Sequence, residues 1–184
     1  MRFSNLAPLT IGVLLLASLS GCAPSGTPES PEPTATFVAP YATDEEALAA
    51  AEEAYAEFVD ISNNILNEGG AAPERIKAIT AGEFADRTLE SYTDFGLEGK
   101  KSIGDARFDS AVLQRYSPGG GNREIITIYL CHDVSEVELL DAQGVSLVKS
   151  DRQNRVRLQV TFDFDDTDQT LRISERDVWT DPEC

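Results

Sequence analysis

Two hydrophobic periodicities divide this chain into a helical part and a β-rich part. Apolar residues recur every three or four positions from Leu48 to Leu66, whereas from Val156 to Phe164 they alternate with polar residues. The first spacing places apolar side chains on one face of a helix, and the second places them on one face of a strand. Because the helices come first and the strands follow as a run, the sequence predicts an α+β fold, with helices packed on a curved antiparallel sheet.

Three helices are predicted in the first half of the folded region. The longest begins at a capping box, with Thr43 as the N-cap and Glu46 three positions later. It ends at NEGG, residues 67–70, because glycine suits the position after a helix end. A short helix begins at Pro73, and a third covers residues 83–95. The side chains expected to face the core are Leu48, Ala51, Tyr55, Phe58, Val59, Ile61, Ile65, Leu66, Phe84, Leu89, Tyr92 and Phe95.

Three hairpins are predicted in the second half, each around a turn rich in glycine, aspartate or proline. The turns are SPGGGN, DAQG and DTDQ. The strand that begins at Val156 alternates most regularly, so one face of the sheet is expected to be buried and the other wet. The predicted strand pairs are residues 105–116 with 123–134, residues 135–141 with 145–151, and residues 155–165 with 171–179.

Two carboxylates interrupt the apolar row of the last predicted strand. By a spacing of two, Glu175, Asp177 and Trp179 share a face with Leu171 and Ile173. If that face lines a pocket, Glu175 or Asp177 is a candidate general base. A bulge or an edge strand would instead turn both acids outward.

The remaining pocket candidates are aromatic. Tyr92 or Tyr129 is the expected hydroxyl donor beside such a base, and Trp179 is expected to line the same pocket. His132, the one histidine, alternates with apolar residues and is expected on a buried face near a strand end. Cys131 falls on the opposite face of that strand, so the two do not form a nucleophile–base pair.

No metal site or cofactor is predicted. The acidic stretch DFDDTDQT, residues 163–170, lacks the glycine and the closing glutamate of a calcium-binding EF-hand loop. It is interpreted as a solvated hairpin turn. Glycine-rich phosphate loops and zinc-type cysteine and histidine spacings do not occur in the sequence.

The first residues have the features of a secretory signal. Arg2 precedes an apolar stretch that runs to Leu19, and this stretch is shorter than the roughly 20 residues of a membrane-spanning helix. Leu19-Ser20-Gly21-Cys22 resembles the lipobox of bacterial lipoproteins. The resemblance implies that residues 1–21 are removed, that Cys22 receives diacylglycerol, and that its new amino terminus is acylated, for example with palmitate. An ordinary secretory signal with an incidental cysteine and an uncleaved anchor are the alternatives.

Residues 22–42 are rich in proline and serine and are predicted to form a semi-rigid tether, although a packed strand around Phe37, Ala39 and Tyr41 is an alternative for its end. The folded domain is accordingly assigned to residues 43–184. A lipid on Cys22 would hold this domain outside the cytoplasm, at the cell membrane.

Charge and cysteine content narrow the function further. With 15 Lys and Arg against 32 Asp and Glu, the chain carries −17 at pH 7. This balance excludes nucleic-acid binding that relies on neutralising phosphates, and it is explained either by solubility or by a basic partner. Apart from Cys22, the chain has Cys131 and Cys184, an even number for an oxidising compartment. We expect them to form a disulfide, with a free buried Cys131 as the alternative.

The order of elements resembles the nuclear-transport-factor-2-like family, whose cystatin-like roll is shared by SnoaL-type cyclases and ketosteroid isomerases. The strings IYLCHDVSEVELLDAQG, KSDRQNRVRLQVTF and DVWTDPEC further resemble small actinobacterial lipoproteins with this fold. The resemblance covers residues 43–184 and implies a cone-shaped domain with an apolar pocket between helices and sheet. It does not imply one activity, because the fold hosts both enzymes and binding modules.

Taken together, these features predict a lipid-anchored, non-catalytic binding or interaction module at the cell envelope. Its expected partners are the membrane, through the lipid on Cys22, and an apolar small molecule or an envelope protein. A pocket enzyme of the isomerase or cyclase type and an acidic docking protein are the alternatives. The sequence leaves the oligomeric state open.

Overall fold

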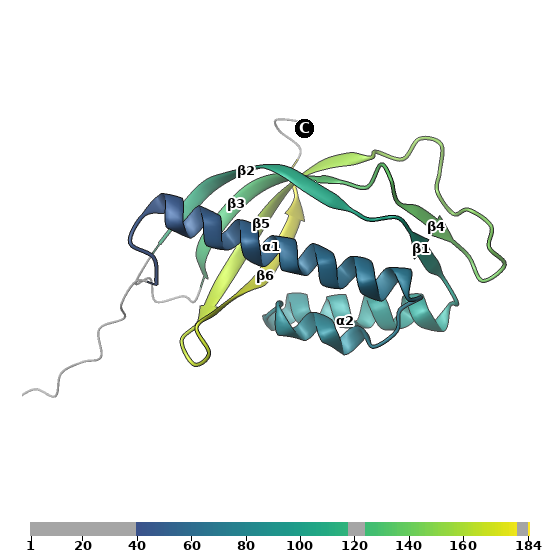
Figure 1. Ribbon diagram of the computed structural model, residues 1–184, viewed down its shortest axis with the longest axis horizontal. Helices are drawn as coiled ribbons and strands as arrows, with labels where there is room; N and C mark the ends of the chain where they lie inside the picture. Colours follow the sequence, from purple (N-terminus) through teal and green to yellow (C-terminus); the bar gives the residue numbers. More distant parts are fainter. Residues whose placement is uncertain (1–39, 118–123, 180–183) are drawn as a thin grey trace, which may run out of the picture. The chain divides into compact units, whose positions relative to one another are not determined.

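The computed structural model describes residues 40–117, 124–179 and 184. The predicted signal peptide, Cys22, most of the tether and residues 118–122 of the first predicted turn lie outside these residues. Residues 37–184 form one compact unit. In this unit, two helices cover one face of a four-stranded antiparallel sheet (Figure 1). The predicted α+β fold is confirmed.

The helices come first and the strands follow, as the periodicities predict. The sheet has the strand order β2-β3-β5-β6, while β1 and β4 form a separate two-stranded sheet at one end of the unit (Figure 1). The elements are α1 (Asp44–Asn67), the 3₁₀ helix η1 (Pro73–Ala78), α2 (Gly82–Leu97), β1 (Lys101–Ile103), β2 (Arg107–Tyr116), β3 (Glu124–Asp133), β4 (Glu138–Leu140), β5 (Arg155–Asp165) and β6 (Thr170–Val178).

Both ends of α1 follow from local sequence. The Thr43 side chain accepts a hydrogen bond from the Glu46 backbone N–H at 3.2 Å, and the Glu46 carboxylate accepts one from Ala42 at 2.8 Å. The predicted capping box is therefore confirmed. At the other end, Gly70 has a φ of 81°, and a Cβ there would lie 2.7 Å from the Gly96 backbone of α2. Glycine is required because the two helices approach so closely at this point.

The core lies between the inner face of the sheet and the apolar faces of α1, η1 and α2. Among the described residues, all buried core side chains come from positions 47–173, so residues 37–184 carry a hydrophobic core of their own. The largest fully buried core side chains are Tyr55, Ile65, Ile76, Ile79, Ile126, Ile128, Leu130, Val160, Phe162 and Ile173.

The second predicted hairpin is wrong in part. β4 pairs with β1, a strand of three residues that its short sequence KSI does not predict, and residues 145–151 contribute only one isolated bridge, between Leu140 and Ser146. The turn itself forms as predicted, because the Asp141 carboxylate accepts hydrogen bonds from the backbone N–H groups of Gln143 and Val145. Beyond it, one ladder bond joins the Leu147 N–H to the Leu139 oxygen at 2.7 Å, and residues 148–151 form no strand.

The end of the predicted tether belongs to the folded unit. The Tyr116 hydroxyl donates to the Tyr41 backbone oxygen at 2.8 Å and accepts from the Tyr41 N–H at 3.1 Å. The Tyr41 ring also packs edge-on against Phe164, with ring centroids 6.3 Å apart. The domain therefore begins slightly earlier than residue 43, because Tyr41 fills a place against the sheet.

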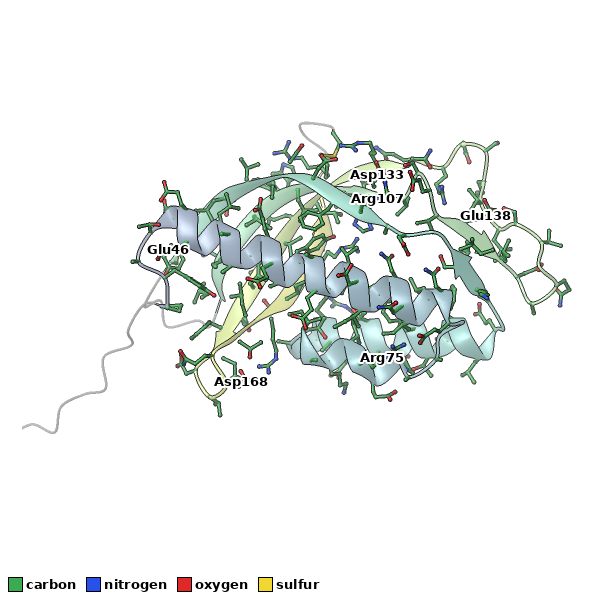
Figure 2. All side chains as sticks on the ribbon, viewed as in Figure 1. Glu46, Arg75, Arg107, Asp133, Glu138 and Asp168 are labelled. Atoms are coloured by element: carbon green, nitrogen blue, oxygen red, sulfur yellow. A yellow bond between two sulfur atoms is a disulfide. The ribbon has the colours of Figure 1, made fainter. Side chains whose placement is uncertain are left out.

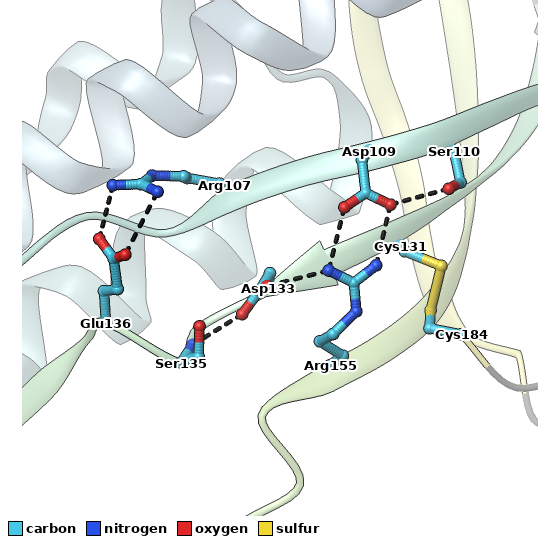
Figure 3. Close-up of polar contacts among 9 residues, drawn as sticks. All are labelled: Arg107, Asp109, Ser110, Cys131, Asp133, Ser135, Glu136, Arg155 and Cys184. Carbon is cyan, nitrogen blue, oxygen red and sulfur yellow. Dashed lines mark hydrogen bonds and ion pairs between the residues drawn. A yellow bond between two sulfur atoms is a disulfide. The ribbon is translucent and has the colours of Figure 1, made fainter.

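Ion pairs and the disulfide lie on the outward face at one end of the sheet (Figure 3). Arg155 of β5 binds Asp109 of β2 and Asp133 of β3, and so links three strands. Cys131 and Cys184 form a disulfide, as expected from their number, which ties the C-terminal residue to β3 (Figure 3). This end of the sheet is thus fixed by both ionic and covalent contacts.

Candidate binding pocket

A cavity of about 210 Å³ opens between α1, α2, β1 and the ends of β3 and β6. Its apolar wall consists of Phe58, Val59 and Leu66 from α1, together with Val134 and Val137 from the segment after β3. Apolar walls with a few polar groups are typical of small-molecule sites, and 210 Å³ is below the roughly 300–1,000 Å³ of pockets for drug-sized ligands. The cavity therefore suits a small ligand.

Hydrogen bonds between neighbouring elements hold two sides of this cavity in place. The Tyr92 hydroxyl of α2 donates to the Ser62 hydroxyl of α1 at 2.9 Å, which joins the helices at the cavity. The Asn63 side chain donates to the Ala106 backbone oxygen at 3.1 Å and accepts from its N–H at 3.0 Å. Burial raises the pKa of Tyr92, so its phenol remains protonated at neutral pH.

Three polar side chains meet at the inner end of the cavity. The Tyr55 hydroxyl lies 3.2 Å from His132 Nδ1, and Arg176 Nε donates to the same hydroxyl oxygen at 3.3 Å. Tyr55 is fully buried, and its ring packs edge-on against Phe108 at 4.9 Å between centroids. The packed ring holds the hydroxyl between the imidazole and the guanidinium.

Burial determines the charge state of His132. The Tyr55 hydroxyl can act both as a donor and as an acceptor, so it hydrogen-bonds His132 Nδ1 in either tautomer of the neutral ring while it accepts from Arg176. Burial, with a further contribution from the Arg176 charge, lowers the pKa of His132 to about 4. At neutral pH this imidazole is therefore uncharged, and a pKa of about 4 makes it a weak base.

A β-bulge decides which residues of β6 face the cavity. Thr161 pairs with Glu175, but the next residue of β5, Phe162, pairs with Ile173, so Ser174 is an extra residue in β6. An extra residue shifts the alternation by one position, and every later side chain changes face. The period-two prediction for the last strand therefore holds only up to Ile173.

The candidates Glu175 and Asp177 do not line the described cavity, and the alternative given for them, a bulge that turns both acids outward, is the one that occurs. Beyond the bulge both carboxylates are exposed on the outward face, while Arg176 lies opposite the fully buried Val160 and enters the cavity wall. The sequence pattern missed Arg176, because without the bulge it faces outward between two acids. No described residue that lines the cavity is an aspartate or a glutamate.

Of the three aromatic pocket candidates, Tyr92 lines the cavity and the other two do not. Tyr129 and Trp179 pack against each other on the outward face, with ring centroids 5.3 Å apart, and Arg157 lies over the Tyr129 ring. Trp179 is turned outward by the same bulge as the two acids. Tyr129 faces outward because it alternates with the inward-facing Ile128 and Leu130 of β3.

The acidic turn between β5 and β6 is bound by an arginine. Asp165 and Asp168, the latter labelled at the tip of this turn in Figure 2, both pair with Arg172. Within residues 40–117, 124–179 and 184, no three histidine, cysteine or acidic side chains are arranged to hold a metal ion. In the same residues, no helix is long and apolar enough to cross a membrane.

Solved structures of other proteins align with most of this chain. The intermembrane-space region of the chloroplast protein ARC6 aligns with 71% of this chain and 95% of its own length, at a TM-score of 0.52 and 11% identity. Aln2 from a Streptomyces species aligns with 74% of this chain and 91% of its own, at a TM-score of 0.45 and 12% identity. No family model and no curated protein matches the sequence. The first likeness shows the fold alone: an α+β domain with helices packed on an antiparallel sheet, distant in sequence from the solved structure.

Proposed function

We propose that this protein is a lipid-anchored binding module outside the cytoplasm, which holds a small molecule in the cavity between α1, α2 and the sheet without transforming it. The observation that carries the proposal is the cavity itself. It has an apolar wall and a small set of convergent polar groups at one end, the arrangement that binds and orients small molecules.

Two features of the cavity favour binding over the isomerase or cyclase alternative. Such an enzyme needs a base beside its substrate, and the described lining contains no carboxylate. His132 is poorly suited to replace one, because burial lowers its pKa to about 4 and so makes it a weak base at neutral pH. The site is therefore equipped to position a ligand by hydrogen bonds and charge.

The anchoring part of the proposal rests on the N-terminal sequence and is supported by the disulfide. Residues 1–21 and Cys22 have the composition and spacing of a lipoprotein signal. Disulfides persist in oxidising compartments and are rare in the reducing cytosol, so the Cys131–Cys184 bond suits a domain displayed on the outer side of the cell membrane.

A ligand retained by the protein tests the pocket. The full chain would be purified from a producing bacterium and examined by native mass spectrometry, beside Val137→Trp, which fills the cavity from its rim. Val145→Trp, at a side chain after β4 that is 60% exposed, is the matched control. We expect a bound small molecule on the wild type and on Val145→Trp and its loss from Val137→Trp. A wild type without any bound mass would count against the proposed function.

Cell fractionation tests the anchor. Cys22→Ser in the full chain should move the protein from the membrane fraction to the soluble extracytoplasmic fraction, because a diacylglycerol supplies the acyl chains for stable anchoring. Cys184→Ser, which removes a different thiol, should stay with the membrane. Unchanged membrane retention of Cys22→Ser would exclude the lipid, and release of the wild type by salt alone would favour the acidic docking alternative.

A further inference from the structure

Arg176 is a cation at the inner end of the cavity, and no carboxylate of the described residues pairs with it. Its Nε donates to Tyr55, and its guanidinium carbon lies 5.9 Å from the centre of the Phe58 ring. Arg176 is partly buried, and beside the apolar wall of the cavity its charge attracts an anion more strongly than it would in bulk water.

The part of Arg176 that is best suited to an anion remains available. A guanidinium has five N–H donors, and the one hydrogen bond to a described residue uses Nε. The two terminal nitrogens form the planar fork that binds a carboxylate through two parallel hydrogen bonds. Because Tyr55 and the Phe58 ring hold the group on its other sides, its orientation is set before a ligand arrives.

The surroundings favour a single negative charge. The described lining contains no acid to repel an anion, and His132 is neutral, so the cavity offers one positive charge and not two. The chain's charge of −17 does not oppose binding at this range, because solvent ions screen exposed charges beyond about 8 Å at physiological salt. The apolar wall of Val59, Leu66 and Val137 suits a short hydrocarbon body.

We propose that the pocket ligand is a small monocarboxylate with a short apolar body, whose carboxylate binds the terminal nitrogens of Arg176 and whose body lies against the apolar wall. This inference rests on the proposed function, since it names the ligand class of the same cavity. The cavity volume favours a free small molecule over the carboxyl end of a peptide.

Three probes separate these cases in NMR titrations of residues 37–184 at pH 7. Hexanoate is the charged probe, 1-hexanol is its neutral counterpart, and N-acetyl-alanyl-leucine presents a peptide carboxylate. The backbone amide signals of His132, Val134 and Val137 report binding in the cavity. We expect hexanoate to bind at least tenfold more tightly than 1-hexanol, and more tightly than the peptide.

Variants assign the charge preference to one side chain. Arg176→Gln should lower the affinity for hexanoate at least tenfold and change the affinity for 1-hexanol by less than twofold. Arg176→Lys keeps the charge but not the planar fork, so its affinity for hexanoate should lie between those of the wild type and Arg176→Gln. Arg157→Gln is the matched control, because it removes the same charge from the outward face of the sheet. Bound hexanoate should also raise the pKa of His132 from about 4, a change that a structural role of Arg176 would not produce.

The outcomes separate this inference from the proposed function. Two outcomes would overturn the carboxylate assignment and leave a pocket for neutral ligands. One is equal affinity for hexanoate and 1-hexanol, and the other is an affinity for hexanoate that Arg176→Gln does not change. Binding of the peptide alone would replace the small molecule by a chain terminus. If none of the probes shifts the three cavity amides, both the inference and the proposed pocket are wrong.

Discussion

Two arginines on opposite faces of the sheet have different surroundings. Arg155 lies on the outward face, where its guanidinium binds Asp109 at 2.9 and 3.0 Å and Asp133 at 3.0 Å (Figure 3). Arg176 lies on the inward face, where a single Tyr55 hydroxyl, 3.3 Å away, is its hydrogen-bond partner among the described residues. Among the described residues, the arginine on the outward face has two carboxylate partners and the one in the cavity has none.

The contrast separates a structural charge from a charge that is available for binding. The two carboxylates accept three hydrogen bonds from Arg155 and compensate its charge, and together they connect β2, β3 and β5. Arg176 contacts the Phe58 ring and the Tyr55 hydroxyl but no described carboxylate. This difference from Arg155 is the reason for the proposal that Arg176 binds the carboxylate of a ligand.

The largest expected effect on stability comes from removing the Cys131–Cys184 disulfide on the outward face. Cys184→Ser should lower the free energy of unfolding by about 4 kcal/mol, because the disulfide closes a long loop in the unfolded chain. Urea unfolding of residues 37–184 measures this, and the wild type under reducing conditions should match the variant. Hexanoate binding to the folded variant should be unchanged, since the tie lies on the other face. A loss below about 1 kcal/mol would contradict a stabilising role.

A smaller effect comes from the inward face and depends on pH. His132 in the folded protein has a pKa of about 4, against 6.5 when exposed, so between these values the unfolded chain binds a proton that the folded protein does not. Stability should therefore fall as the pH decreases from 6.5 to 4, by at most about 3 kcal/mol. Urea midpoints across this range would measure the slope.

The control for this prediction is His132→Gln, which should remove most of the slope between pH 6.5 and 4. Asp133 contributes at lower pH, because hydrogen bonds from Ser135, with Arg155 nearby, lower its pKa to about 2. Its stabilisation is present above the ordinary carboxyl pKa and is lost as the pH falls toward 2. Equal slopes in both proteins between pH 6.5 and 4 would show that His132 is already charged in the fold.

The smallest expected effect compares the two arginines directly. Arg155→Met should lower the melting temperature by roughly 2–5 °C, since Asp109 and Asp133 then face each other without a cation. Arg176→Met should leave the melting temperature unchanged or raise it, because it removes a cavity cation that has no carboxylate partner. Thermal unfolding followed by circular dichroism compares them. Equal losses would mean that Arg176 is as structural as Arg155.

Most of the helices and strands could be predicted from local patterns in the sequence. The capping box at Thr43 and the helix stripe through Tyr55 and Phe58 depend on contacts within a few residues, so α1 follows from sequence. The cysteine count predicted the disulfide, because compartment and parity limit the choices. The pairing of β4 with β1 could not be predicted, since a strand of three residues has too little alternation to reveal its partner.

Sequence patterns predicted only some of the residues that line the cavity. The sequence by itself determined the α+β order, the buried face of α1 with Tyr55, and the inward position of His132, because helix and strand periods are properties of the chain. Only the tertiary structure decided that Arg176, and not Glu175 or Asp177, enters the cavity. One extra residue at Ser174 reverses every later side chain of β6, and its position depends on how β6 pairs with β5.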